Sequence, residues 1–189
     1  MVELSILIPT IPPRLPNEFP SIYASLMKQL DGRKNVEVLG LCDNFVWSIG
    51  AKRNRLLSIA SGSFICFVDD DDEVSGDYVD ELLAAIKKPG VDHVSFETKI
   101  WAEQFINYES FEEKTESGYL NLESPHTHLH AWKKSFLQQE KFSDVSFAED
   151  NDWATKLANK NPVTHHISKV LYFYRFDPLA SEARNEAPA

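Results

Sequence analysis

Short apolar runs and longer amphipathic segments alternate along the first part of the chain. Three of the apolar runs are rich in β-branched or aromatic residues and end at polar or turn residues, as buried strands do. They span residues 4–8, 36–42 and 64–68. The segments between them, residues 17–30 and 49–60, repeat their apolar positions with the period of a helix. This order predicts an α/β fold in which right-handed crossovers join parallel strands.

The remainder of the chain gives weaker patterns. A helix is predicted over residues 77–87, with Ser75 as its N-cap and Pro89-Gly90 after its end. A second helix is predicted to begin near Ala148 and to stop at Asn161-Pro162. Extended segments are predicted at residues 91–101, 118–122, 127–132 and 169–175. Residues 179–189 have a composition typical of disorder, so we expect one domain over residues 1–178.

Composition and charge are those of an ordinary globular protein. The chain has 189 residues and a formal net charge of -10, which argues against a broad surface for nucleic acid. No apolar segment approaches the ~20 residues that span a bilayer, and the acidic start of the chain does not resemble a secretory signal. Cys42 and Cys66 both lie in apolar runs. We therefore expect buried thiols, no membrane span and a reducing, cytoplasmic setting.

Four consecutive aspartates, Asp69–Asp72, follow the apolar run 64–68 directly. Such a cluster is also compatible with a solvated acidic turn at a helix start. Ligands of open α/β sheets, however, bind at the carboxyl ends of the strands, where Asp43 is expected to lie as well. Carboxylates and phosphate oxygens are the ligands that Mg²⁺ and Mn²⁺ prefer. The pattern therefore favours a metal or nucleotide site over a simple surface turn.

The densest basic cluster of the chain lies near the start of the helix predicted over residues 49–60. Lys52, Arg53 and Arg55 follow Gly50, with Asn54 on the same turn. They could form an exposed helix face. A helix start that combines backbone donors with cationic side chains also suits a diphosphate or a nucleobase edge.

Three histidines alternate in the sequence HTHLH, at positions 126, 128 and 130. On a strand, this spacing would place all three side chains on one face. A zinc or nickel site is then conceivable, although histidines lining a polar pocket are the favoured interpretation.

Several segments taken together resemble one known family. The segments are Ile8-Pro-Thr10, Cys42-Asp-Asn44, Gly50-Ala-Lys-Arg-Asn54 and residues 60–72. They resemble, in this order, the nucleotide-binding half of family 2 glycosyltransferases, which has an Ala-Arg-Asn-type turn followed by Ala-x-Gly and a strand ending in Asp-x-Asp-Asp. Residues 147–153 look like the Glu-Asp motif of that family, and residues 172–177 look like its closing strand with Tyr-Arg. The resemblance covers roughly residues 4–178.

The resemblance implies a GT-A fold, an α/β architecture with a mixed sheet flanked by helices. It also implies an inverting transfer of sugar that depends on Mn²⁺ or Mg²⁺. The expected donor is a nucleotide sugar, UDP-linked in the first instance, and the acceptor hydroxyl is unknown. Residues 1–90 would form the nucleotide-binding half of the catalytic domain, and residues 91–178 would form the acceptor and catalytic half.

Roles carried over from the family fall on particular residues of this chain. Asp150 would be the general base, Glu149 would orient the acceptor, and Asp71 would ligate the metal. Asp69 would lie against the ribose. His130 and Trp132 would face the acceptor or the donor sugar. The other residues expected at the nucleotide are Pro9, Thr10, Asp43, Asn44, Lys52, Arg53 and Asp70.

One departure from the family pattern affects the third metal ligand. The family often ends in Tyr-Arg-x-His, whereas this chain has Tyr174-Arg-Phe-Asp177. Asp177 can supply an oxygen ligand instead. The alternatives are that His165 or His166 takes the place, or that the third protein ligand is missing.

Three other functions were weighed against the glycosyltransferase. The segment Asp70-Asp-Asp-Glu-Val74 fits the Asp-x-Asp-x-Val pattern of haloacid-dehalogenase-type phosphatases, but that motif normally closes the first strand of its fold. A calcium loop starting at Asp71 fails because Leu82 stands where a bidentate Glu is required. A relic of the glycosyltransferase fold that binds nucleotide or carbohydrate without catalysis is the third.

Overall fold

The computed structural model describes residues 1–102, 111–114, 119–122, 126–138 and 140–176. Its strands form one sheet in the order β2-β1-β3-β8-β5-β7-β6, with β9 beside β5 and β4. The strands are β1 (Leu4–Thr10), β2 (Val36–Cys42), β3 (Phe64–Phe67), β4 (Glu73–Val74), β5 (His93–Ala102), β6 (Phe111–Lys114), β7 (Tyr119–Leu122), β8 (Ala131–Lys133) and β9 (Thr164–Phe176).

The sheet is mixed, which confirms the expected fold class. β1 pairs in parallel with both β2 and β3, as the strand-helix alternation predicts. β8 then runs antiparallel between β3 and β5, whereas β9 runs parallel to β5. The strand predicted over residues 127–132 is wrong in its first part, because β8 begins only at Ala131 and turns precede it.

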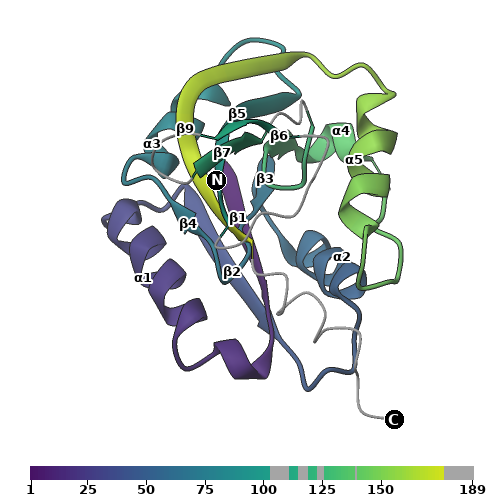
Figure 1. The fold of residues 1–189 in the computed structure, drawn as a ribbon. Helices are drawn as coiled ribbons and strands as arrows, with labels where there is room; N and C mark the ends of the chain where they lie inside the picture. Colours follow the sequence, from purple (N-terminus) through teal and green to yellow (C-terminus); the bar gives the residue numbers. More distant parts are fainter. Residues whose placement is uncertain (103–110, 115–118, 123–125, 139, 177–189) are drawn as a thin grey trace.

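Helices cover both faces of the sheet (Figure 1). α1 (Glu18–Leu30) and α3 (Tyr78–Ala85) lie on one face, and α2 (Ile49–Ile59) and α5 (Glu149–Ala158) lie on the other. The short α4 (Lys134–Leu137) follows β8, and a 3-10 turn, η1 (Pro12–Arg14), follows β1. These four helices lie where the sequence predicted helices, α1 and α2 from apolar periodicity and α3 and α5 from start and stop signals.

Each face of the sheet has its own hydrophobic core. Alternate side chains of β1 point to opposite faces, so Ile6 packs with Leu26 of α1 whereas Leu7 packs with Leu56 of α2. Trp153 of α5 is fully buried in the second core. β1 is therefore buried on both sides, as the continuous apolar sequence of a central parallel strand requires.

The predicted N-cap of α3 is wrong by two residues. The helix is preceded by Asp77, and Ser75 instead donates a hydrogen bond from its hydroxyl to the Asp77 carboxylate at 2.8 Å. The same carboxylate also pairs with Lys169 of β9. Asp77 therefore has partners on both sides of the helix start, which the local sequence could not reveal.

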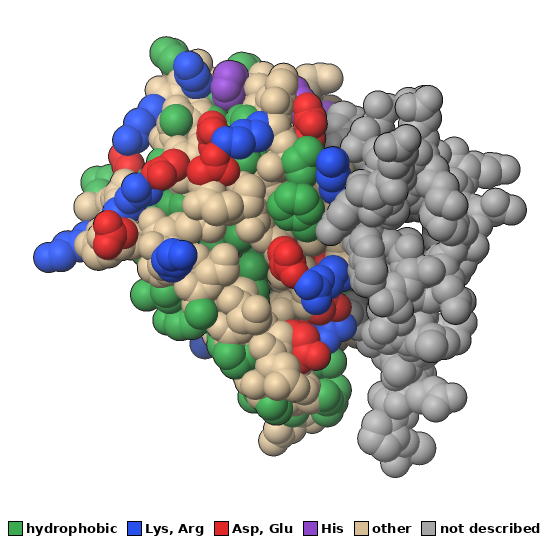
Figure 2. Space-filling view, turned by 60° about the vertical axis from the view of Figure 1, so that its left-hand side comes forward, with side chains coloured by type: hydrophobic (Ala, Val, Ile, Leu, Met, Phe, Trp, Pro, Cys, Tyr) green, Lys and Arg blue, Asp and Glu red, His purple; other side chains and the backbone are tan. Residues whose placement is uncertain are grey.

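Charged side chains of both signs are mixed on the face that carries α1 and α3 (Figure 2). Ion pairs on this side include Arg33 with Asp80 at 2.5 Å and Lys169 with Glu81 at 2.9 Å. This face therefore offers no broad basic surface among the residues described. In the described part of the chain, no helix combines the length and the apolar character that crossing a membrane requires.

The N-terminus of α2 holds the segment that leads into α5. The Gly50 amide donates to the Val145 carbonyl at 3.1 Å, and Ser48 donates to the Asp144 carboxylate at 2.5 Å. Asn54 exchanges two hydrogen bonds of 2.9 Å with the backbone of Phe142. The asparagine of the GAKRN segment thus orients the chain just before Glu149 and Asp150.

Replacing Gly50 with Ala is expected to destabilise the protein by about 1–3 kcal/mol, the usual cost of overpacking. A Cβ at this position would lie 1.9 Å from the Ser143 carbonyl oxygen, which is backbone and cannot rotate away. Gly76→Ala is the matched control, because a Cβ there meets nothing within 4 Å. Urea denaturation of both variants is the measurement. Equal urea midpoints for the two variants would mean that the backbone of residues 143–147 shifts to accommodate the new Cβ at no measurable cost in stability.

Candidate functional site

The carboxyl ends of β1, β2 and β3 lie at one edge of the sheet because these strands are parallel. Thr10 ends β1, Asp43 follows β2, and the Asp69–Asp72 cluster follows β3. The sequence prediction that these polar residues converge is therefore supported by the topology. The contacts among them define two adjoining groups, one around Lys52 and Arg14 and one around Arg53.

Lys52 joins the ends of β1 and β2. Its ammonium lies 2.5 Å from an oxygen of Asp43 and 3.1 Å from the Thr10 carbonyl oxygen, although the side chain is buried. Burial raises the pKa of Asp43, but hydrogen bonds from Lys52 and from the amides of Trp47 and Val46 outweigh it and lower the pKa. Asp43 is consequently an ionised acceptor with a fixed orientation.

Arg14 of η1 binds two members of the aspartate cluster. Its Nη1 lies 2.5 Å from Asp70 and its Nη2 lies 2.6 Å from Asp71. Thr10 also donates to Asp70 at 2.5 Å, and Asp70 is almost fully buried. Burial lowers the pKa of Arg14, but the charges of Asp71 and Asp70 outweigh it and raise the pKa. Sequence reasoning missed Arg14, which lies between prolines after the first strand and belongs to none of the recognised motifs.

Arg53 is the centre of the second group. Its guanidinium donates to Glu149 and, at 3.0 Å, to Asp69, and it lies over the rings of Phe67 and Phe142. Arg53 and Glu149 are both about 4% exposed, so this is a buried ion pair. Burial raises the pKa of Glu149. Arg53 thereby connects the cluster after β3 to the start of α5.

His128 lies between Asp69 and Asp150. Its Nδ1 is 3.2 Å from Asp150, and its Nε2 is 3.0 Å from Arg53 and 3.5 Å from Asp69. Because a guanidinium only donates, Nε2 accepts from Arg53 and Nδ1 carries the proton toward Asp150. Sequence reasoning singled out His128 but not this role, because the strand geometry assumed for it does not exist.

Asp150 differs from its neighbour Glu149 in exposure and ionisation. The Asp150 side chain is 37% exposed, whereas that of Glu149 is 5% exposed and engaged with Arg53. Burial raises the pKa of Asp150, but His128 and Arg53 outweigh it and hold the pKa well below the usual carboxyl range. Asp150 is thus the carboxylate of this pair that solvent or a second substrate can reach.

Asp72 connects the aspartate cluster to β9. It accepts hydrogen bonds from the Tyr172 hydroxyl at 2.7 Å and from the Arg175 amide at 2.7 Å, and it is buried. The Tyr172 hydroxyl in turn accepts from the Asp69 amide at 3.0 Å. The last aspartate of the cluster therefore fixes the loop against β9, leaving Asp69 and Asp71 to face the site.

The residues expected at the acceptor or donor sugar lie in the interior. His130 and Trp132 are 2% and 0% exposed, and both pack around His93. Burial and neighbouring imidazoles lower the pKa of His93 to about 2 and that of His130 to about 3, so both rings are neutral. Neither side chain presents a face to a sugar in this structure, and the three alternating histidines do not share one face.

The remaining sequence-derived candidates occupy different places. Pro9 is buried in β1 next to Thr10, and Asn44 is exposed beyond the end of β2. Asp177 lies outside the described residues. His165 and His166 pair with Val94 and Ser95 at the start of β5. The Nδ1 atom of His166 lies 3.0 Å from the Ser95 hydroxyl oxygen. The identity of a third metal ligand stays a prediction.

The donor set fits a hard divalent cation whose coordination is completed by substrate. Among the described residues no three His, Cys, Asp or Glu side chains are placed to hold a metal by themselves. Asp71 offers a carboxylate whose side chain is 25% exposed. Mg²⁺ and Mn²⁺ sites commonly use one or two carboxylates together with substrate phosphate oxygens. The site therefore fits a cation that arrives with a diphosphate.

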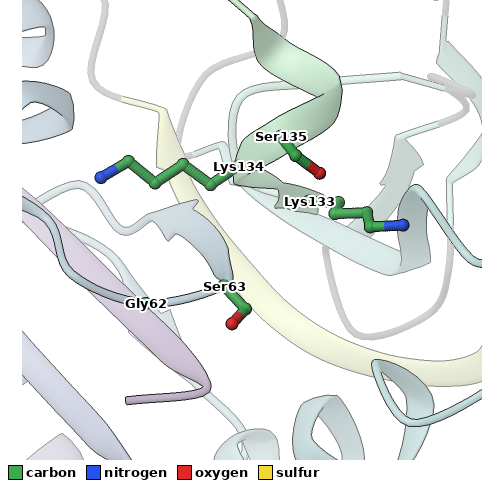
Figure 3. Close-up of a pocket in the computed structure, with 5 residues that line it drawn as sticks. All are labelled: Gly62, Ser63, Lys133, Lys134 and Ser135. Carbon is green, nitrogen blue, oxygen red and sulfur yellow. The ribbon is translucent and has the colours of Figure 1, made fainter. Parts of the chain in front are cut away.

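A recess of about 480 Å³ elsewhere in the fold does not contribute to this site. Its lining residues are Gly62, Ser63, Lys133, Lys134 and Ser135, which lie at the start of β3 and the end of β8. The two lysines extend away from each other (Figure 3). Lys134 also donates to the Ala60 carbonyl. The two lysine side chains are therefore not directed at a common point where a ligand would bind.

Solved glycosyltransferase structures share this fold. S. aureus TarS 1-349 in complex with UDP-GlcNAc aligns with a TM-score of 0.69 at 16% identity, covering 100% of this chain and 62% of that one. A further S. aureus TarS structure aligns with a TM-score of 0.67 at 18% identity, covering 97% of this chain and 38% of that one. The mannosyltransferase PcManGT from Pyrobaculum calidifontis, in complex with GDP-Man and Mn²⁺, aligns with a TM-score of 0.58 at 14% identity. The alignment covers 97% of this chain and 60% of that one. At these identities the likeness shows the fold.

This chain spans between 38% and 62% of the length of the chains in those three structures. The search of curated proteins found no match. A family model, by contrast, matches most of the sequence. The model described as Glycosyl transferase family 2 covers residues 17–147, which include β2, α2 and the Asp69–Asp72 cluster. The chain belongs to glycosyltransferase family 2.

Proposed function

We propose that this protein is an inverting, metal-dependent glycosyltransferase that uses a nucleoside-diphosphate sugar, with UDP as the first nucleotide to test. The observation that carries the proposal is the arrangement of three functions at one edge of the sheet. A fixed acceptor, Asp43, lies beside Lys52, and a carboxylate for a cation, Asp71, lies beside Arg14. An ionised, accessible Asp150 contacts His128, and Arg53 connects His128 to Asp69 of the aspartate cluster.

The donor would lie across the ends of β1, β2 and β3. Asp43 and Thr10 would meet the nucleoside, and Asp69 would accept from the ribose hydroxyls. Asp71 would hold Mn²⁺ or Mg²⁺, which when bound neutralises charge on the departing diphosphate. Lys52 is already engaged by Asp43, so it would serve this site by keeping the Asp43 carboxylate oriented.

Asp150 would take the proton from the acceptor hydroxyl as that oxygen attacks the sugar. A single base suffices for inversion because no covalent intermediate forms. His128 would hold the Asp150 carboxylate through Nδ1, and Arg53 would hold His128 in that tautomer. Glu149 would act by fixing Arg53 rather than by touching the acceptor, because its carboxylate is buried against the guanidinium.

The phosphatase alternative does not fit this fold, because the phosphatase motif normally closes the first strand whereas the acidic cluster here follows the third strand, β3. The glycosyltransferase family match also covers the cluster.

Calorimetric titration with UDP and GDP, with and without Mn²⁺, tests the proposal directly. We expect one nucleoside diphosphate to bind, and its binding to require Mn²⁺. Asp71→Asn should abolish the metal-dependent binding of the nucleotide while leaving the thermal unfolding midpoint nearly unchanged, because its side chain is partly exposed. Asp80→Asn, on the exposed side of α3, is the control. The absence of nucleotide binding at any metal concentration would refute the proposal.

A further inference from the structure

The position of Arg14 has a consequence for how a cation enters the site. Its two terminal nitrogens lie 2.5 Å from Asp70 and 2.6 Å from Asp71. The Arg14 side chain is only 14% exposed, and that of Asp70 is 2% exposed. The guanidinium is thus a largely desolvated charge that bridges two neighbouring carboxylates.

A divalent ion ligated by Asp71 needs an oxygen of that carboxylate and repels a positive charge a few ångströms away. The guanidinium and the ion therefore compete for Asp71. Asp70 keeps a second partner when Arg14 leaves, because Thr10 donates to its other oxygen at 2.5 Å. The buried carboxylate is consequently not stranded by the exchange.

We propose, on the basis of the function proposed above, that Arg14 is a displaceable resident cation of the donor site. In the ligand-free protein its guanidinium occupies the place beside Asp71 that a divalent ion takes, and in the donor complex it turns to the diphosphate. A planar guanidinium matches phosphate oxygens well, so the diphosphate supplies the anion that Arg14 gives up at Asp71. Arg14 thereby couples metal binding to nucleotide binding.

The test measures Mn²⁺ binding by electron paramagnetic resonance in the nucleotide-free protein and again with saturating UDP. In wild type we expect weak Mn²⁺ binding that UDP strengthens strongly. In Arg14→Gln we expect Mn²⁺ to bind the nucleotide-free protein roughly tenfold more tightly, because a competing charge is gone. The factor by which UDP improves Mn²⁺ affinity should fall in the same variant.

Arg33→Gln is the matched control, since it removes one surface arginine paired with Asp80 and changes the net charge equally. Arg14→Lys guards against misfolding: a single ammonium cannot bridge both carboxylates, so its Mn²⁺ affinity should lie between wild type and Arg14→Gln. The proposal is overturned if Arg14→Gln binds Mn²⁺ no more tightly than Arg33→Gln does. It is equally overturned if UDP improves the Mn²⁺ affinity of Arg14→Gln by the same factor as it does in wild type.

The two proposals fail in different ways. If UDP and GDP bind no variant, the glycosyltransferase proposal falls, yet Mn²⁺ affinity in the nucleotide-free protein still reports on Arg14. If wild type binds UDP with Mn²⁺ but Arg14→Gln leaves Mn²⁺ affinity unchanged, only the role of Arg14 is refuted.

Discussion

Replacing Asp150 with Asn is expected to lower the rate of sugar transfer by roughly 10²- to 10⁴-fold, the range typical for loss of a general base. The amide has almost the same shape and can still accept from His128 Nδ1, which lies 3.2 Å from the carboxylate in the native protein. It cannot take a proton. The affinity for the nucleoside diphosphate should therefore remain close to that of wild type, so that kcat falls and donor binding does not.

The matched control is Asp152→Asn, two residues further along α5, where the carboxylate is exposed and pairs with Lys156 at 2.6 Å. This variant should transfer sugar at the wild-type rate. Donor turnover and nucleotide binding are measured side by side for both variants. Full transfer activity in Asp150→Asn would exclude it as the base and direct attention to another acceptor of the proton.

The pH dependence of turnover gives a second reading of the same site. The pKa of Asp150 lies well below the ordinary carboxyl value because His128 and Arg53 outweigh burial. A base with a lowered pKa stays ionised as the pH falls through the usual carboxyl range of about 4. Any loss of wild-type activity between pH 7 and 5 must therefore come from a group other than Asp150.

Local patterns predicted the first half of the fold well. β1 and β3 are buried strands and β2 is half-buried, and each begins where its apolar run begins. α1 and α2 show helical periodicity in their own sequences. Each of these signals lies within one element. The convergence of Thr10, Asp43 and Asp69 followed from parallel topology alone, without any knowledge of side-chain contacts.

The parts that escaped prediction depend on contacts between distant segments. Arg14 contacts Asp70, which lies 56 positions away in the sequence, and the residues around Arg14 do not predict such a partner. His128 meets Asp150 because the chain turns before β8, whereas its alternating neighbours suggested a strand. His130 and Trp132 have residue types that suit a sugar site, yet the fold packs them around His93. Residue type indicates chemistry, but burial decides whether it is available.

Replacing Arg53 with Met is expected to reduce the free energy of unfolding by about 3–5 kcal/mol, the usual cost of removing one partner of a buried ion pair. Methionine keeps an unbranched side chain next to Phe67 and Phe142, but it removes the guanidinium that lies over both rings. Glu149 and Asp69 are then left without their common cation. Glu149 is 4% exposed, so water cannot replace the lost partner. Chemical denaturation at pH 7 measures the loss.

Arg55→Met is the matched control, because Arg55 lies on the same helix with its side chain exposed; it should change stability by less than about 0.5 kcal/mol. Adding Glu149→Gln to Arg53→Met should restore part of the loss, since one of the two stranded charges is then absent.

The deficit of Arg53→Met should also depend on pH in a defined direction. In wild type, the charge of Arg53 outweighs burial and holds the pKa of Asp69 well below its usual value. That stabilisation is fully present above the unfolded pKa of about 3.9 and is lost as the pH falls further toward the folded value. In the variant, burial raises the pKa of Asp69 and Glu149, so acid relieves the unpaired charges. The difference between the two proteins is therefore largest near neutral pH and shrinks as the pH falls. A difference that stayed constant on acidification would mean that Arg53 stabilises the fold by packing rather than by pairing with these carboxylates.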